Sequence, residues 1–212
     1  MKEQRKTFYL DDDESKPITA GGVMIYRFNN NDIEVLLADT RGTFEDLGGY
    51  VDKKDKDIMS TVAREAFEES NELLNRKKIR TRLKTAQYIY VPKMKYLVYL
   101  ILANSEETKL VSSDFGDIEK HDNILRKINW YPLNILKRAD IFKEKLNWRI
   151  KNRKIYDTLK EIKYSNRIDI TFFDKPEPST ESTTKSTVES TTKSNTKSNA
   201  ESAVKSANKK KK

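Results

Sequence analysis

Two apolar stretches near the N-terminus have the composition of β-strands. Residues 17–28, PITAGGVMIYRF, and residues 33–40, IEVLLADT, are rich in apolar and β-branched side chains. The polar run 29–32 between them is typical of a turn. The pattern therefore predicts a β-hairpin, and a short connection then leads to Gly48 and Gly49.

Three more strands are predicted further along the chain. Residues 78–91 and 95–103 have the composition of two strands joined at a turn that contains Pro92, and residues 124–130 have that of a third. Residues 104–123 are largely polar and predict a loop. The expected core is thus a sheet.

Some side chains in this region have two interpretations. Tyr88 and Tyr90 are two residues apart and share one face of a strand. They could stack on a base in a cleft, or pack in or beside the sheet, as aromatic residues on strands commonly do. His121, the single His of the chain, is either catalytic or an exposed loop residue.

The region after the two glycines predicts an amphipathic helix, which Asp55 or Asp57 can cap. Its apolar side is suited to a core and comprises Val62, Ala63, Ala66, Phe67, Leu73 and Leu74. Glu65, Glu68 and Glu69 gather on another side, because residues three and four apart share a helix face. This carboxylate patch is either a solvated acidic surface or a site for a hard cation such as Mg²⁺.

A second amphipathic helix is predicted over residues 140–164, with residues 168–173 as a short edge strand. Its apolar stripe comprises Phe142, Leu146, Ile150, Ile155, Leu159 and Ile162. Its remaining surface is strongly basic through Lys143, Lys145, Arg149, Lys151, Arg153, Lys154 and Lys160. It is either a ridge that binds RNA phosphates or a solvated helix packed on the sheet.

Composition and charge indicate the domain organisation and exclude some kinds of chemistry. The chain has 212 residues, a formal net charge of +9 and no Cys, so disulfides and thiol chemistry are excluded. Residues 1–16 are predicted to be a polar lead-in, 17–174 one domain, and 175–212 a disordered Ser/Thr/Lys-rich tail. The tail carries nine Lys and four Glu, so the body is only weakly basic.

Without a secretory h-region or a membrane-length apolar run, an intracellular, cytoplasmic location is expected.

The segment from Gly48 to Asn71, GGYVDKKDKDIMSTVAREAFEESN, resembles the Nudix box, G-x5-E-x7-R-E-U-x-E-E-x-G-U with U a bulky aliphatic. The opening glycines match, and REAFEE, residues 64–69, matches R-E-U-x-E-E with Ala66 at U. The loop is one residue longer, so that Asp55 or Asp57 replaces the usual Glu. Asn71 replaces the closing Gly and can adopt the same left-handed conformation. The longer loop and Asn71 also resemble divergent Nudix proteins of large DNA viruses, and the Lys-, Ile-, Asn- and Tyr-rich composition is compatible with an AT-rich source of that kind.

The resemblance implies an α+β fold, a Nudix α/β/α sandwich. A mixed curved sheet would carry the Nudix helix on one side and a C-terminal helix on the other. It implies a pyrophosphohydrolase acting on acid anhydrides, with Mg²⁺ or Mn²⁺ as cofactor. The metal ligands would be Glu65, Glu68, Glu69 and the carbonyl of Gly48, and the catalytic residues Arg64, Glu65 and Glu68.

By the same resemblance, Arg64 would hold the catalytic loop by hydrogen bonding. Helical geometry predicts that its side chain points away from the carboxylates. A further acid could be Asp55, or come from the late loop, where the candidates are Asp114, Asp117 and Glu119. The residues that bind the substrate are not identifiable from the sequence.

Three functions remain open at this stage. By the same resemblance, the substrate would be a nucleoside diphosphate linked to another group, and one candidate is the mRNA cap, with RNA held by the basic C-terminal helix and tail. Another is a small nucleotide: a dinucleoside polyphosphate, a nucleotide sugar or a damaged nucleoside triphosphate. The third is a non-catalytic nucleic-acid-binding or structural protein, which the retention of Glu65, Glu68 and Glu69 disfavours.

Overall fold

A seven-stranded mixed sheet forms the centre of the protein. The structure, a computed structural model, describes residues 6–30 and 32–173, and the backbone alone over 166–173. The sheet order is β5-β4-β3-β8-β7, with β6 paired to β3 and β9 to β4; only the β3–β8 pair is parallel among the described strands. The strands are β3 (Ala20–Asn29), β4 (Asp32–Thr40), β5 (Thr43–Glu45), β6 (Leu47–Tyr50), β7 (Gln87–Val91), β8 (Tyr96–Leu102) and β9 (Lys127–Pro132).

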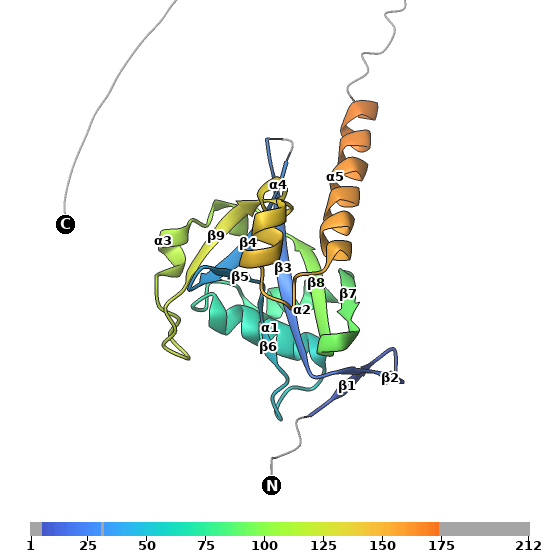
Figure 1. Ribbon diagram of the computed structural model, residues 1–212, viewed down its shortest axis with the longest axis vertical. Coiled ribbons are helices and arrows are strands. Elements are labelled where there is room, and N and C mark those ends of the chain that lie inside the picture. Colours follow the sequence, from blue (N-terminus) through green and yellow to red (C-terminus); the bar gives the residue numbers. More distant parts are fainter. Residues whose placement is uncertain (1–5, 31, 174–212) are drawn as a thin grey trace, which may run out of the picture. The chain divides into compact units, whose positions relative to one another are not determined.

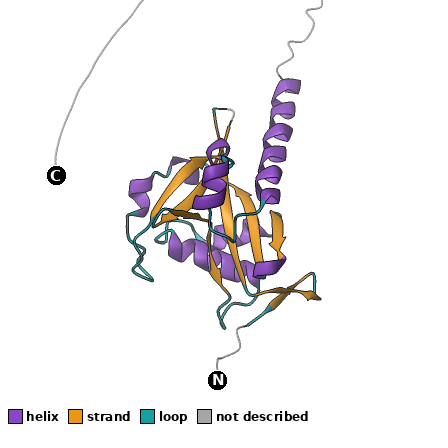
Figure 2. Ribbon diagram, in the orientation of Figure 1, coloured by secondary structure: helices purple, strands orange, loops and turns teal. Residues whose placement is uncertain are grey.

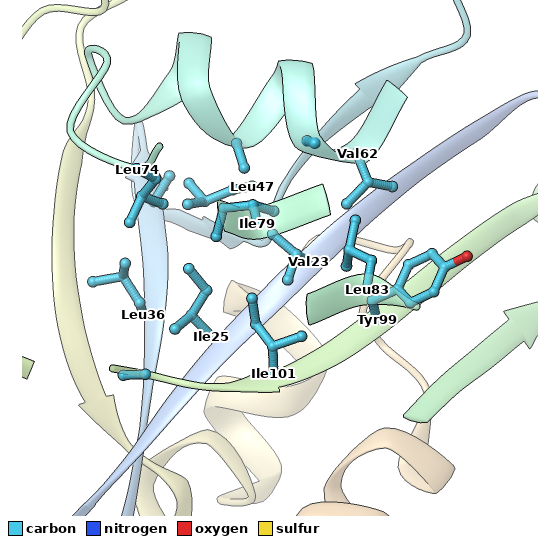
Figure 3. Close-up of a cluster of buried hydrophobic side chains, with 14 of the residues drawn as sticks. Val23, Ile25, Leu36, Leu47, Val62, Leu74, Ile79, Leu83, Tyr99 and Ile101 are labelled. Carbon is cyan, nitrogen blue, oxygen red and sulfur yellow. The ribbon is translucent and has the colours of Figure 1, made fainter. Parts of the chain in front are cut away.

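Alternate residues of the central strands supply two separate cores. Val23 and Ile25 of β3 face one side of the sheet, where α1 (Ile58–Glu69) and α2 (Arg76–Leu83) cover them (Figure 3). Met24 faces the other side. The period of two is expected of a strand buried on both faces, and it sets which side of the sheet each helix occupies.

The second side is covered by C-terminal elements. These are α4 (Leu133–Leu136), the π-helical turn η3 (Ile141–Lys145) and α5 (Arg153–Phe173) (Figures 1 and 2). Leu146, Ile150, Ile155 and Leu159 are buried in this second core. The loops add η1 (Pro92–Met94), η2 (Glu107–Lys109) and α3 (Ser112–Phe115). The expected α+β class, with a mixed curved sheet between helices, is therefore confirmed.

The N-terminal lead-in contains structure that the sequence did not predict. Antiparallel strands β1 (Phe8–Leu10) and β2 (Asp13–Ile18) form a hairpin there. Asp11 and Asp12 make its turn with positive φ values of 54° and 59°, a conformation that Asp adopts more readily than most residues. The predicted tail, 175–212, lies outside the described residues, so its disorder stays a prediction.

The prediction of one strand over residues 78–91 is wrong in its first half. Residues 76–83 form α2, which is capped by Asn75, whose side chain accepts hydrogen bonds from the backbone N–H groups of Lys77 and Lys78. Ile79 and Leu83 lie one turn apart and are both buried. The apolar spacing of four, together with a capping Asn, is a helical signal.

The prediction of one helix over residues 140–164 is also wrong in part, because an extended Leu146 and a turn at 148–150 separate η3 from α5. There Leu146 makes a β-bridge with Phe44, and the backbone N–H of Asn147 donates to the carbonyl of Phe44 at 2.9 Å. The edge strand predicted over 168–173 is instead the end of α5. Among the described residues, no helix is long and apolar enough to cross a membrane.

Ile79→Ala tests the helical assignment of residues 76–83. Ile79 is fully buried, so its truncation should lower the free energy of unfolding by about 2–4 kcal/mol. Thr81→Ala is the control: Thr81 would share a face with Ile79 in a strand but is exposed on α2, and should cost under about 0.5 kcal/mol. Chemical denaturation measures both. Similar losses in the two variants would contradict the helix.

Candidate active site

The strand β6 and the helix α1 approach each other closely because β6 contains Gly48 and Gly49. Any Cβ atom on Gly49 would collide with the carboxylate of Glu65. The backbone N–H of Gly48 donates to Glu69 at 2.7 Å. Gly22 and Gly48 pair across β3 and β6, and a Cβ on Gly22 would collide with Asp46. These glycines therefore allow the carboxylates of α1 to reach the sheet backbone.

The loop between β6 and α1 assigns different roles to its two candidate acids. Asp57 caps α1, since its side chain accepts a hydrogen bond from the backbone of Ser60 at 2.7 Å. It also pairs with Arg80 of α2. Asp55 is buried and accepts from the backbone N–H of Asp52 at 2.9 Å. Asp55 is thus the acid that organises the longer loop.

Arg64 joins this loop to the helix. Its guanidinium donates to the carbonyl of Tyr50 at 2.9 Å and to Asp55 at 3.0 Å, which is the loop-holding contact that the resemblance implied. Burial opposes ionisation of Asp55, but hydrogen bonds from Arg64 and the backbone hold its pKa below the usual range. Ionised Asp55 is therefore a stable anchor for Arg64.

The prediction that Arg64 points away from the carboxylates is wrong. Its Nη1 lies 2.8 Å from Glu65 and 2.9 Å from Glu68. A long side chain next to a crowded carboxylate pair bends toward the negative charge, which helical geometry alone does not capture. Arg64 therefore neutralises two members of the patch.

Glu69 is the third member and has a different cation. Arg126 of the segment before β9 lies 3.0 Å from it and also pairs with Glu119. Arg126 and Glu119 are both buried, so Arg126 bridges the helix to the late loop. Of the three late acids, Glu119 is the one joined to an α1 carboxylate.

Burial raises the pKa of two of the carboxyl groups. Burial raises the pKa of Glu69 to about 7, although Arg149 and Arg126 oppose the shift. Burial also raises the pKa of Glu65 against the opposing charge of Arg64. Ionised carboxylates here need more positive charge than the two neighbouring arginines provide.

The carboxylates of the patch are the candidate ligands for a metal ion. They are oxygen donors of the class that Mg²⁺ and Mn²⁺ prefer, so their chemistry fits such a cation. In the part of the chain that the structure describes, however, no three acidic or His side chains are grouped to hold one. Their oxygens are instead paired with Arg64 and Arg126. Metal binding would require these ion pairs to open.

Asn71 follows α1 and has two roles. Its φ of 54° confirms the predicted left-handed conformation. Its side-chain amide donates to the carbonyls of Phe115 and Ile118 at 2.6 and 2.9 Å, and accepts from the N–H of Lys120 at 2.9 Å. A Gly at this position would have no such contacts. Asn71 therefore fastens the loop that carries Glu119 to the end of α1.

A buried ionic network supports β6 from the second side of the sheet. Arg149 donates to the carboxylate of Asp46 at 2.7 Å and to its carbonyl at 2.8 Å. It also lies 3.2 Å from Glu45. The hydroxyl of Tyr96 donates to Asp46 at 2.8 Å. Asp46 has no exposed surface, so Arg149 compensates its charge.

Other candidates lie apart from the carboxylates. His121 is exposed and 3.7 Å from Glu72. Asp114 accepts from the backbone of Val111 in α3, and the side chain of Asp117 is exposed. The hydroxyl of Tyr90 donates to the carbonyl of Pro17 at 2.9 Å, which agrees with packing beside the sheet.

Sequence reasoning missed Arg126, Asp46 and Tyr96 and misplaced Arg149, which was assigned to a basic surface ridge. Buried partners far apart in sequence leave no local signal. The one available hint was Asp46 directly before the apolar Leu47 and the glycines, where an acid is expected to need a partner. The role of Gly48 as a metal ligand stays a prediction.

Comparisons with known proteins give structural likeness alone. No family model and no curated protein matches the chain. A crystal structure of a C. elegans Ap4A hydrolase binary complex matches with 21% identity over 72% of this chain and 98% of that chain, with a TM-score of 0.41. The NUDIX domain of Shewanella oneidensis NrtR with ADP ribose matches with 13% identity, over 71% and 88%, with a TM-score of 0.42. Identities and TM-scores this low leave function to be inferred from the residues of the site.

Glu69→Gln tests the electrostatics of the patch through the pH dependence of stability. A carboxyl whose pKa is 4.5 unfolded and about 7 folded binds more protons in the folded state between these values. Its contribution to stability therefore falls as pH rises from about 4.5 to 7, by roughly 2–3 kcal/mol. The variant should lose this dependence, measured as the free energy of unfolding near pH 5 and pH 7.5. An unchanged pH slope would refute the assignment.

Arg149→Met tests the buried network. The variant leaves the carboxylate of Asp46 buried without its cation, so the free energy of unfolding should fall by about 3–5 kcal/mol. Lys154→Met, at an exposed position of α5, removes the same charge and should cost under about 0.5 kcal/mol. Thermal denaturation compares the two. Equal melting temperatures would place Arg149 at the surface.

Proposed function

We propose that this protein is a Nudix-type pyrophosphohydrolase that uses Mg²⁺ or Mn²⁺ and cleaves a nucleoside diphosphate linked to another group. The main observation in support is that Glu65, Glu68 and Glu69 lie beside β6, the strand that contains Gly48 and Gly49. Arg64 fastens the loop between β6 and α1. Burial raises the pKa values of Glu65 and Glu69, and a bound cation would lower them again and favour the ionised carboxylates.

The reaction follows from these groups. Water oxygen forms a bond to one phosphorus of the diphosphate, and the bridging oxygen leaves with the other phosphate. A bound divalent cation would screen the phosphate charge and polarise the phosphoryl group. Glu65, whose pKa is raised by burial, would accept the proton of the attacking water. Arg64 and Asp55 keep the loop in position.

Arg126 and Glu119 extend this proposal to the late loop. Glu119 is the additional acid of the site, because Arg126 holds it next to Glu69. Glu69, Glu65 and Glu68 would hold the cation once Arg64 and Arg126 release them.

For the attached group we propose the mRNA cap, which makes the protein a decapping enzyme. The basic residues on the second side of the sheet favour a long polyanion over a small nucleotide, since Lys143, Lys151 and Arg153 are exposed there. A small-nucleotide substrate is the alternative. A non-catalytic role is disfavoured by the retention of Glu65, Glu68 and Glu69.

Glu68→Gln tests the catalytic assignment. Loss of this carboxylate should reduce Mg²⁺-dependent turnover by at least about 100-fold while the melting temperature stays within a few degrees. Glu72→Gln is the control, because Glu72 is exposed just beyond α1. Product analysis on capped RNA and on a panel of small nucleotides, with Mg²⁺ and with Mn²⁺, provides the readout.

The outcomes separate the alternatives. Release of a methylated guanosine diphosphate from capped RNA alone would establish decapping. Turnover of a small nucleotide alone would reject the cap and keep the hydrolase. Undiminished turnover by Glu68→Gln would reject the carboxylate assignment, and a folded protein silent on every substrate would reject catalysis.

A further inference from the structure

Two adjoining clefts lie on the side of the sheet opposite α1. The first, of about 520 Å³, lies between the η1 turn and the segment that precedes α5, and its lining includes Lys93, Trp148, Lys151 and Arg153. The second, of about 340 Å³, lies between α4, η3 and α5, and its lining includes Lys137, Phe142, Lys143, Arg153 and Tyr156. Arg153 lines both, so the two clefts form one continuous surface.

This surface is strongly basic. Five cationic side chains line it against the single carboxylate of Asp157, which lies 4.0 Å from Lys137. Lys93, Lys143 and Arg153 have no ion pair within the described residues. The ammonium of Lys151 donates to the carbonyl of Lys143, which keeps its charge in the surface. Such a concentration of like charge in a cleft attracts a polyanion.

Trp148 gives the first cleft an aromatic wall. Its side chain is 50% exposed, whereas the other Trp, Trp130, is 7% exposed and covered by Arg27. A large aromatic ring left open to solvent among cations is the combination that binds single strands: bases stack on the ring while phosphates meet Lys and Arg. A simple acidic peptide would use the cations but not the ring.

We propose that these clefts bind single-stranded nucleic acid, with a base stacked on Trp148 and backbone phosphates on Arg153, Lys93 and Lys143. This surface takes the place of the basic ridge that was predicted along a single helix. Arg149 was part of that ridge but does not belong to the surface, because its side chain is largely buried. Trp148 directly precedes Arg149, whose guanidinium holds Asp46 beside the glycine strand. The choice of RNA as the natural strand rests on the proposed function, but the binding site does not.

The test is a binding titration with the full chain in EDTA, so that hydrolysis cannot intervene. Fluorescently labelled oligouridylate of about 15 nucleotides reports affinity by anisotropy, and intrinsic fluorescence reports stacking, because Trp148 is the exposed one of the two Trp residues. The oligonucleotide should quench Trp148 emission, and Trp148→Ala should weaken binding roughly 5- to 100-fold. Polyglutamate should cause no quenching.

Arg153→Glu has a matched control in Arg76→Glu. Arg153 begins α5 and Arg76 begins α2, both are exposed, and an acidic residue is tolerated at the start of a helix. Arg153→Glu should weaken binding at least about tenfold and lower the salt slope of log Kd by roughly one. Arg76→Glu should change affinity less than about twofold.

Two results would overturn the proposal. One is equal loss of affinity in Arg153→Glu and Arg76→Glu, which would mean diffuse charge attraction. The other is unchanged affinity in Trp148→Ala together with no quenching of Trp148 emission in the unsubstituted protein. This result would mean that the strand binds elsewhere on the chain. Binding as expected without turnover of capped RNA would reject the decapping proposal and keep this one.

Discussion

The close contact between β6 and α1 is the constraint on which the rest of the structure depends. The N–H of Gly48 donates to Glu69, and the carboxylate of Glu65 occupies the space that a side chain on Gly49 would fill. Because a strand can approach a helix this closely only without side chains, the glycines decide where the helix lies on the sheet. The carboxylates, their loop and the late segment are then arranged around that contact.

Charge balance explains how this contact is maintained. Arg64 neutralises Glu65 and Glu68, and Arg126 neutralises Glu69 from the late loop. On the second side of the sheet, Arg149 compensates the fully buried Asp46. Buried charges are retained only where such partners are present. Each arginine comes from a different part of the chain, so the ion pairs also join the elements to one another.

The carboxylate patch of α1 and the surface around Trp148 have opposite electrostatic character. The patch on α1 presents three carboxylates, which are oxygen ligands of the kind that a divalent cation prefers. The other surface presents an excess of Lys and Arg around the half-exposed Trp148. The network of Arg149 and Asp46 lies between the two surfaces. The proposed substrate, a diphosphate at the end of a long polyanionic strand, would suit both.

The sequence alone determined the elements whose signals are local. Apolar and β-branched composition predicted β3, β4 and β8, and the spacing of three and four placed Glu65, Glu68 and Glu69 on one face of α1. Only the tertiary structure decided which arginine pairs with which carboxylate. Arg126 is 57 residues from Glu69, and Arg149 is 103 from Asp46, so no local pattern relates them. The extended segment around Leu146 has helical composition, but its bridge to Phe44 outweighs that propensity, because burial and backbone pairing across the sheet contribute more than local preference.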